Sequence, residues 1–441
     1  MKPEKIRHTS QMDFVRMELK DLVDRRHELV KLAHQMQWAG FDEEFGATYA
    51  DFGRPGAPTR MMVGLHYLKW AYDLSDDEVI ARWVENPYWQ YFCGRQYFEH
   101  EVPIDSSSMT NWRKRIGVNG AESLFRETVQ TAIRRGYLKK KDCEKVIVDT
   151  TVQTKAIRFP TDARLYDRMR ERLVKAAQSA GIELRQTYER VGPHLLRRQQ
   201  GYGHAKQYRR AERETKKLKT LLGRVVRDIE RKRPEGGVTF SGLLALAHRL
   251  LEQQRDSKNK IYSVHEPHVE CIAKGKVHRR YEFGNKVGLV LSARKNWIVG
   301  VKSFMGNPYD GHTLNDNLKQ SERMTDVKIA KAVCDLGYRG HDVNDTEISI
   351  VPRKKKGVPE TIRRLWRRRN AIEPIIGHEK AEHRLERNRL AGVRGDQLNA
   401  VMAACGFNIK KLLRAFCALI RKSFEDGYAW LRTTFFVLGI A

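Results

Sequence analysis

The sequence has little that would hold it in a membrane or direct it out of the cell. No stretch of its 441 residues approaches the roughly 20 apolar residues that a membrane-spanning helix needs. The opening segment, MKPEKIRHTSQMDF, lacks the apolar core of a signal peptide. The apolar segment 430–441 is short and contains Arg432. We therefore expect no membrane partner and predict a cytoplasmic protein.

Disulfide bonds are not expected either. The six cysteines are scattered along the chain and never form a CxxC pair: Cys93, Cys143, Cys271, Cys334, Cys405 and Cys417. This spacing is typical of reduced thiols in a cytoplasmic protein and argues against a small secreted domain held together by disulfides.

Acidic residues are in marked deficit. The chain has 83 Lys and Arg against 54 Asp and Glu, which leaves a formal net charge of +29 and a pI near 9.9. A surplus of this size favours a polyanionic partner, either nucleic acid or an anionic membrane surface. Because no membrane-spanning segment supports a membrane partner, we expect nucleic acid first.

Against this basic background, three carboxylates stand in informative places. Asp149 ends the apolar run KVIVD, Asp335 follows KIAKAVC, and Glu373 lies in the basic segment LWRRRNAIEPIIGHEK. Three acids brought together repel one another unless a cation lies between them. Carboxylate oxygens select Mg²⁺ or Mn²⁺, and two such ions can stabilise both the attacking and the leaving oxygen in phosphoryl transfer. The acids therefore predict metal-dependent phosphate chemistry.

Hydrophobic periodicity predicts an all-α N-terminal region. Apolar residues recur at helical spacing in residues 11–36 and 59–92, with the Gly/Pro break ADFGRPGAPT between them. Ser75 can cap a helix, with Glu78 three residues further on. A basic helix begins near SSSMTNWRKRIG. This order is compatible with a DNA-binding helix-turn-helix, and an ordinary helical bundle is the alternative.

The remainder of the chain predicts a mixed α/β sheet interrupted by one large helical insertion. Strands are expected at 144–153, at two places within 281–305 with a turn near Arg294–Asn296, before Asp335, and at 347–352. Residues 160–260 read as basic helices, with an apolar face at Leu218, Leu221, Leu222, Val225, Val226 and Ile229. Further helices are expected at Thr313–Met324, 359–390 and 396–422, the last with an apolar face at Leu398, Val401, Met402, Cys405, Ile409 and Leu412.

The spacing around Glu373 singles it out from neighbouring acids. Trp366, Arg369, Glu373 and Lys380 are separated by three, four and seven residues, which places them along one face of an uninterrupted helix. Glu379 and Glu382 fall off that face. Pro374 disfavours helical geometry at Glu373, so either the helix kinks there or a new helix begins with Pro374 in its first turn.

The pattern W-x2-R-x3-E-x6-K, from Trp366 to Lys380, resembles the Y-x2-R-x3-E-x6-K signature of bacterial insertion-sequence DDE transposases. Other segments resemble the insertion-sequence-five family: DTT at Asp149, YEFGNKVGLVLSA, NPYDGHTL, DLGYRG from Asp335, AIEPIIGHEK and GLHYLKWAYDLSDDEVIARWVENPYWQYFCG. Together they cover about residues 50–415, and their combination is far more specific than any one of them.

The resemblance implies an RNase H-like catalytic core. In it, Asp149, Asp335 and Glu373 are the catalytic triad and bind Mg²⁺ or Mn²⁺. Water attacks the phosphodiester at an element end, and the freed 3′-hydroxyl then attacks target DNA. The implied partners are double-stranded DNA, as terminal inverted repeats and target, and a second copy of the chain, since two ends must be brought together.

The resemblance also implies DNA contacts around the triad. Arg369 and Lys380 would hold phosphates near the scissile bond, with Tyr338 and Arg339 as further DNA contacts. Trp366 stands where the signature has tyrosine. The hydroxyl is lost, and stacking on a base remains open to the indole ring.

Four regions follow from these predictions. Residues 1–140 form a helical domain for DNA-end binding, dimerisation or both. Residues 141–160 and 262–422 form the catalytic domain, 161–261 the basic helical insertion, and 423–441 a C-terminal tail.

Two other functions stay open at this point: an RNase H-like nuclease that cuts without joining, and a DNA-binding derivative that has lost catalysis. The ligand-like spacing of His265, His268 and Cys271 is set aside, because the matching family segment implies no metal there and a zinc site needs four ligands.

Overall fold

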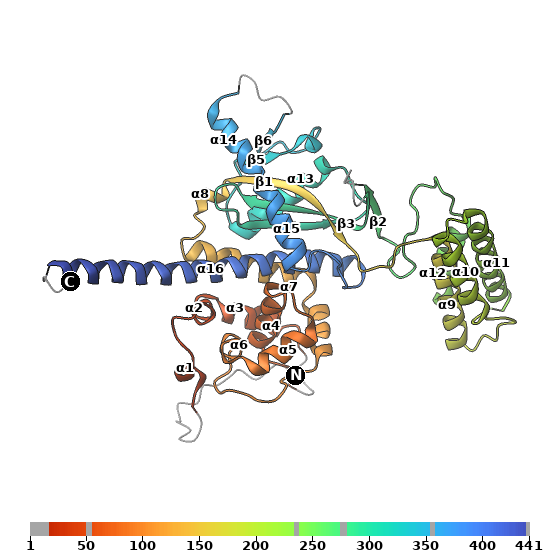
Figure 1. Cartoon of the computed structure of the whole chain (residues 1–441), viewed down its shortest axis with the longest axis horizontal. Coiled ribbons are helices and arrows are strands. Elements are labelled where there is room, and N and C mark those ends of the chain that lie inside the picture. Colours follow the sequence, from red (N-terminus) through yellow and green to blue (C-terminus); the bar gives the residue numbers. More distant parts are fainter. Residues whose placement is uncertain (1–16, 50–54, 233–237, 274–279, 353–357, 438–441) are drawn as a thin grey trace. The chain divides into compact units, whose positions relative to one another are not determined.

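The computed structural model describes residues 17–49, 55–232, 238–273, 280–352 and 358–437 (Figure 1), with side chains omitted for 238–239 and 419–437. The chain divides into two compact units. The first comprises Met1–Gln153, Lys286–Phe304 and Pro308–Ala441, and the second comprises Thr154–Asn285 and Met305–Asn307. No helix in the described ranges is long and apolar enough to cross a membrane.

The described N-terminal part of the first unit is mainly helical, as predicted, and one isolated antiparallel bridge there pairs Glu18 with Tyr97. Its helices are α1 (Leu19–Leu22), α2 (Glu28–Gln35), α3 (Trp38–Gly46), α4 (Thr59–Ala71), α5 (Asp76–Glu85), α6 (Pro87–Phe92), α7 (Ser106–Arg134) and α8 (Lys140–Cys143). The predicted cap of α5 is confirmed. The Glu78 amide donates to Ser75 Oγ at 3.1 Å, and the Ser75 amide donates to Glu78 Oε2 at 2.7 Å.

A buried ionic cluster joins three of these helices. Arg113 on α7 donates to both carboxylate oxygens of Asp76 at 2.7 and 2.6 Å, and Lys69 on α4 donates to Asp76 Oδ1 at 2.7 Å. Burial alone would raise the pKa of Asp76, but the hydrogen bonds and charges of Arg113 and Lys69 outweigh burial and lower it well below its ordinary value. The same burial lowers the pKa of Lys69 to about 8.

One mixed sheet carries the strands, which confirms the predicted α/β class. The strands are β1 (Lys145–Thr154), β2 (Glu270–Ala273), β3 (Tyr281–Ser292), β4 (Ile298–Phe304), β5 (Lys331–Cys334) and β6 (Glu347–Ile350). Their order is β2-β3-β1-β5-β6, with β4 also pairing with β3. The β1–β5 and β5–β6 pairs are parallel, whereas β2–β3 and β3–β4 are antiparallel. Sequence reasoning missed the short strand β2.

Four α-helices and one 3₁₀ turn accompany the sheet in the C-terminal part of the first unit: α13 (Asp310–Thr325), η1 (Leu336–Tyr338), α14 (Glu360–Arg369), α15 (Ile372–Glu382) and α16 (Gly392–Val437). The predicted helical region over 359–390 allowed a new helix at Pro374, and its predicted end was wrong. The region is split after Arg369, and it ends at Glu382 because Arg384 and Arg387 adopt left-handed backbone angles, with φ of 64° and 60°.

The long helix α16 joins the N-terminal helices to the sheet within the first unit. It packs against α2, α4 and α7 as well as against β4 (Figure 1). The predicted apolar face is confirmed, since Leu398, Val401, Met402, Cys405, Ile409 and Leu412 are all buried. A Cβ at Gly406 would lie 2.5 Å from the Trp70 carbonyl oxygen of α4, so this close approach requires glycine. One continuous hydrophobic core results.

The second unit contains the helical insertion, which follows β1 as predicted. Its helices are α9 (Asp162–Ser179), α10 (Val191–His204), α11 (Tyr208–Lys232) and α12 (Val238–Glu252). All six residues of the predicted apolar face on α11, from Leu218 to Ile229, are buried. They pack with residues of α9 and α12 in a second hydrophobic core.

Candidate active site

Asp149 and Asp335 emerge from adjacent parallel strands of the first unit. Asp335 directly follows β5, whereas Asp149 lies inside β1, which continues for five more residues to Thr154. The register pairs Ile147 with Val333, two residues before each acid. Because side chains alternate along a strand, the two carboxylates project from the same face.

A backbone amide orients each of these carboxylates through one oxygen. The Thr150 amide donates to Asp149 Oδ1 at 2.8 Å, and the Gly337 amide donates to Asp335 Oδ1 at 2.8 Å. In both residues the other oxygen, Oδ2, faces the guanidinium of Arg369. Each acid is therefore fixed at one oxygen and presents the second to a common cation.

Arg369 contacts all three predicted acids. Its Nη2 lies 2.9 Å from Asp149 Oδ2 and 3.4 Å from Asp335 Oδ2, and its Nη1 lies 3.9 Å from Glu373 Oε1. The Arg369 and Asp149 side chains are only 16% and 15% exposed, whereas that of Asp335 is 40% and that of Glu373 is 71% exposed. The structure thus brings the predicted triad together around one positive charge.

This arrangement pairs the carboxylates with arginine. Among the described residues, no group of three or more His, Cys, Asp or Glu side chains is arranged to hold a metal ion. The donor chemistry nevertheless suits a hard cation, because three carboxylates already surround a positive charge. The Nε atom of Arg369 is also buried and finds no hydrogen-bond partner among the described residues, so the guanidinium does not satisfy its own donors there.

The junction between α14 and α15 explains how Glu373 reaches Arg369. Asn370 and Ala371 keep right-handed helical angles between the two helices, and Pro374 lies in the first turn of α15. The second alternative for Pro374, a new helix, is therefore correct. Glu373 still lies one turn from Arg369, and Lys380, which is partly exposed, lies two turns further along α15.

Two of the five residues expected to contact DNA are packing residues. The Trp366 side chain is 7% exposed and its Nε1 donates to Ser349 Oγ on β6 at 3.0 Å. Tyr338 is fully buried, which raises the pKa of its phenol well above the ordinary value. A DNA contact by either ring stays a prediction, and it would require that ring to leave the core. Arg339 is exposed and remains accessible.

Sequence reasoning missed Asp310, a fourth acid beside the triad. Asp310 Oδ1 accepts hydrogen bonds from Thr150 Oγ1 and from Lys286 Nζ, each at 2.9 Å. A Cβ at Gly337 would lie 3.0 Å from Asp335 Oδ1 and 3.1 Å from Asp310 Oδ2, so glycine leaves room for both carboxylates. The sequence signal that could have identified Asp310 was the segment NPYDGHTL, because Asp310 is its one acidic residue.

Two family models and one known protein match this chain. Residues 17–115 match a family model described as Transposase domain (DUF772). Residues 337–413, which include Arg369 and Glu373, match one described as Transposase DDE domain. The chain is also 52% identical over 196 residues to a Rhizobium meliloti protein named "Uncharacterized protein ORF8 in nfe locus". The aligned region covers 44% of this chain and 95% of that relative. No solved structure matches.

Proposed function

Because the chain belongs to the DDE transposases of bacterial insertion sequences, we propose that it cuts the ends of such an element and joins the freed 3′-hydroxyl to target DNA. The observation that carries this proposal is the convergence of Asp149, Asp335 and Glu373 on Arg369. These acids come from three separate elements, and a salt bridge that served stability alone would need only one of them.

The three carboxylates would hold Mg²⁺ or Mn²⁺. When bound, such an ion supplies positive charge to the oxygens of the reacting phosphodiester. Asp149 and Asp335 suit this role because a backbone amide already orients each of them, so little conformational freedom is lost on binding. Glu373 is the most exposed of the three and completes the site from α15.

Arg369 would exchange partners when DNA arrives. Its planar guanidinium suits a phosphate as well as a carboxylate, and backbone phosphates are the strongest anions that DNA offers. As Arg369 turns to a phosphate, the acids become free to bind a cation. Arg339 and Lys380 would contribute further phosphate contacts, and Asp310 would position Lys286 and Thr150 beside the acids.

An RNase H-like arrangement is part of the proposal. It is supported by the sheet order β2-β3-β1-β5-β6 with β4 paired to β3, in which the antiparallel hairpin β3–β4 adjoins the three parallel strands β1, β5 and β6. It is also supported by the two acids on the neighbouring strands β1 and β5.

The other regions would recognise DNA ends and assemble the complex. We assign end binding, dimerisation or both to the helical region 1–140, and DNA contact to the basic insertion 161–261. Catalysis is assigned to 141–160 with 262–422. Two element ends must meet for transposition, so the working form would be a homodimer on DNA.

Incubation of the full-length protein with labelled end DNA and Mg²⁺ tests the proposal. Wild type should nick the DNA at the element end and then form joined products. Asp149→Asn should bind the same DNA within a few-fold of wild type and yield neither product, because it removes a carboxylate charge and keeps the shape. Cleavage by Asp149→Asn at the wild-type rate would refute the site, and nicking without joining would identify a nuclease.

A further inference from the structure

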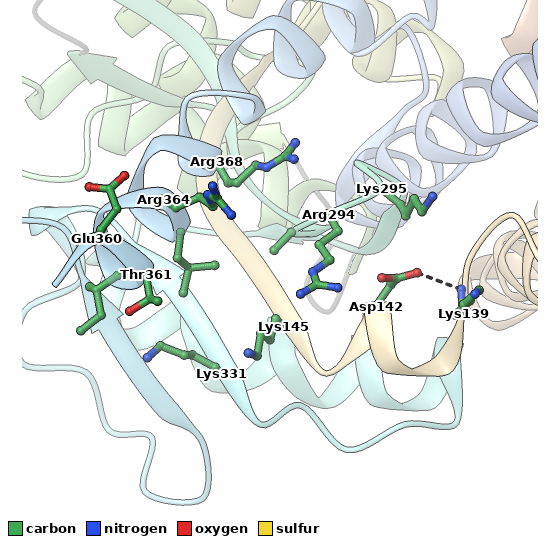
Figure 2. A pocket seen from close by; sticks show the side chains of 13 residues that line it. Lys139, Asp142, Lys145, Arg294, Lys295, Lys331, Glu360, Thr361, Arg364 and Arg368 are labelled. Atoms are coloured by element: carbon green, nitrogen blue, oxygen red, sulfur yellow. Dashed lines mark hydrogen bonds between the residues drawn. The ribbon is translucent and has the colours of Figure 1, made fainter.

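A large basic pocket lies in the first unit, lined in part by the face of α14 that carries Arg364 and Arg368. Its volume is about 1070 Å³, and seven of its thirteen lining residues are Lys or Arg. Figure 2 shows these cations reaching the pocket from several elements, among them Lys145, Arg294, Lys295, Lys331, Arg364 and Arg368. None of these six residues belongs to the triad.

Backbone structure fixes where these cations stand. Lys145 and Lys331 are directly paired at the starts of the parallel strands β1 and β5. The Ala293 amide donates to the Lys145 carbonyl at 2.9 Å, which joins the end of β3 to the same edge. Arg364 and Arg368 are four residues apart on α14 and so share one face of that helix.

The turn that carries Arg294 and Lys295 is held from α16. Lys411 Nζ donates to the carbonyls of Lys295 and Asn296 at 2.6 and 2.7 Å, and Asn296 takes a left-handed backbone angle, with φ of 55°. Burial, together with the charges of Lys295 and Arg414, lowers the pKa of Lys411 to about 8. The turn therefore lies in a region of excess positive charge, to which Lys295, Lys411 and Arg414 contribute.

Most of this charge is not neutralised within the described structure. Lys331 pairs with Glu347, but the side chains of Lys145, Arg294, Lys295, Arg364 and Arg368 make no ion pair with any described residue. The lining also contains two acids, against seven Lys and Arg residues. Asp142 accepts from the Lys139 amide (Figure 2), and Glu360 pairs with Arg367. Like charges gathered in this way repel one another until an anion binds.

We propose that this basic pocket is a second DNA-binding site, which holds backbone phosphates of duplex DNA without reading its sequence. The inference rests on the proposed function and adds a site to it. Two features connect the pocket to the acids. Helix α14 carries Arg369 towards them and Arg364 and Arg368 towards the pocket. On β1, Lys145 precedes Asp149 by four residues, which corresponds to about 13 Å at roughly 3.3 Å per residue. About four base pairs of duplex DNA span the same length.

A triple variant tests the pocket against a matched control. The pocket variant is Arg294→Gln/Arg364→Gln/Arg368→Gln. The control is Arg135→Gln/Lys319→Gln/Lys328→Gln, which removes three exposed charges of the same unit outside the pocket. Affinity for a duplex of unrelated sequence is measured between 50 and 200 mM salt. Each phosphate contact contributes about 0.9 to the slope of log K against log salt, so the pocket variant should lose up to about 2.7 of that slope and the control much less.

The outcomes separate this inference from the proposed function. At low salt and saturating protein, the pocket variant should still nick end DNA, whereas Asp149→Asn should not. A salt slope that falls no further in the pocket variant than in the control overturns the inference, whatever Asp149→Asn does. The inference is also overturned if the pocket variant loses binding of inorganic pyrophosphate but keeps the wild-type slope of log K against log salt for DNA. The pocket would then be a site for small anions.

Discussion

Replacing Arg369 by glutamine should weaken the fold and, at the same time, improve metal binding by the DNA-free protein. The guanidinium holds Asp149 at 2.9 Å in a largely buried pair and Asp335 at 3.4 Å in a half-exposed one. Removal of one partner of a buried ion pair costs about 3–5 kcal/mol. The more exposed contacts, to Asp335 and Glu373, add little, because solvent screens them. We expect the free energy of unfolding to fall by about 3 kcal/mol.

The metal should compensate for this loss. In wild type, a divalent cation must displace Arg369 from the carboxylates, whereas in Arg369→Gln it meets them unpaired. Since about 1.4 kcal/mol corresponds to a tenfold change in affinity, relief of about 3 kcal/mol allows up to roughly 100-fold tighter binding. The glutamine amide can retain a hydrogen bond to Asp149, so a gain of about 10- to 100-fold is expected.

Mn²⁺ titration of the DNA-free protein, followed by electron paramagnetic resonance, measures this affinity. Urea unfolding with and without Mn²⁺ measures the accompanying stability. Arg368→Gln is the control, because it removes the same charge from the same helix without touching the acids. If Arg369→Gln binds Mn²⁺ no more tightly than wild type, competition between arginine and metal for these carboxylates is refuted.

Two further predictions concern buried carboxyl groups. Asp76→Asn should lower the free energy of unfolding at pH 7 by about 3–5 kcal/mol, because Arg113 loses its buried partner. The folded-state pKa of Asp76 is depressed, so its stabilisation is present above the unfolded pKa of about 3.9 and is lost as the pH falls further. Urea unfolding at pH 7 and pH 3 should therefore show a smaller difference between variant and wild type at pH 3. Glu379 is fully buried, and burial raises its pKa well above the ordinary value. The free energy of unfolding of the wild type should consequently fall by up to about 1.4 kcal/mol for each pH unit above the unfolded-state pKa of about 4.3. Glu379→Gln should abolish that loss in urea unfolding between pH 5 and 7, and an unchanged slope would refute the assignment.

The three candidate acids could be singled out from the sequence because each has a strong local signal. Asp149 and Asp335 follow apolar β-branched runs that must be buried, and Glu373 has fixed spacing to Arg369. Periodicity also located the buried faces of α11 and α16, since it depends only on residues close in sequence.

The surroundings of the acids could not be predicted, because they depend on tertiary contacts. No local pattern indicates that Arg369 reaches across to β1, or that Asp310 shares Thr150 with the acid site. The burial of aromatic residues could not be predicted for the same reason. Trp366 lies in a run of arginines that suggests an exposed helix, yet its ring packs inward onto Ser349 of β6.

The position of α16 in the chain also determines when the protein can fold during its synthesis. The N-terminal helices complete their core with residues of α16 such as Cys405 and Phe416, which the ribosome adds roughly 270 residues after α8. At about 5–20 residues per second, this delay is about 15–55 s. The N-terminal helices therefore reach their final packing only when Asp149, Asp335 and Glu373 have already been made. A nascent or prematurely terminated chain then has no complete N-terminal core.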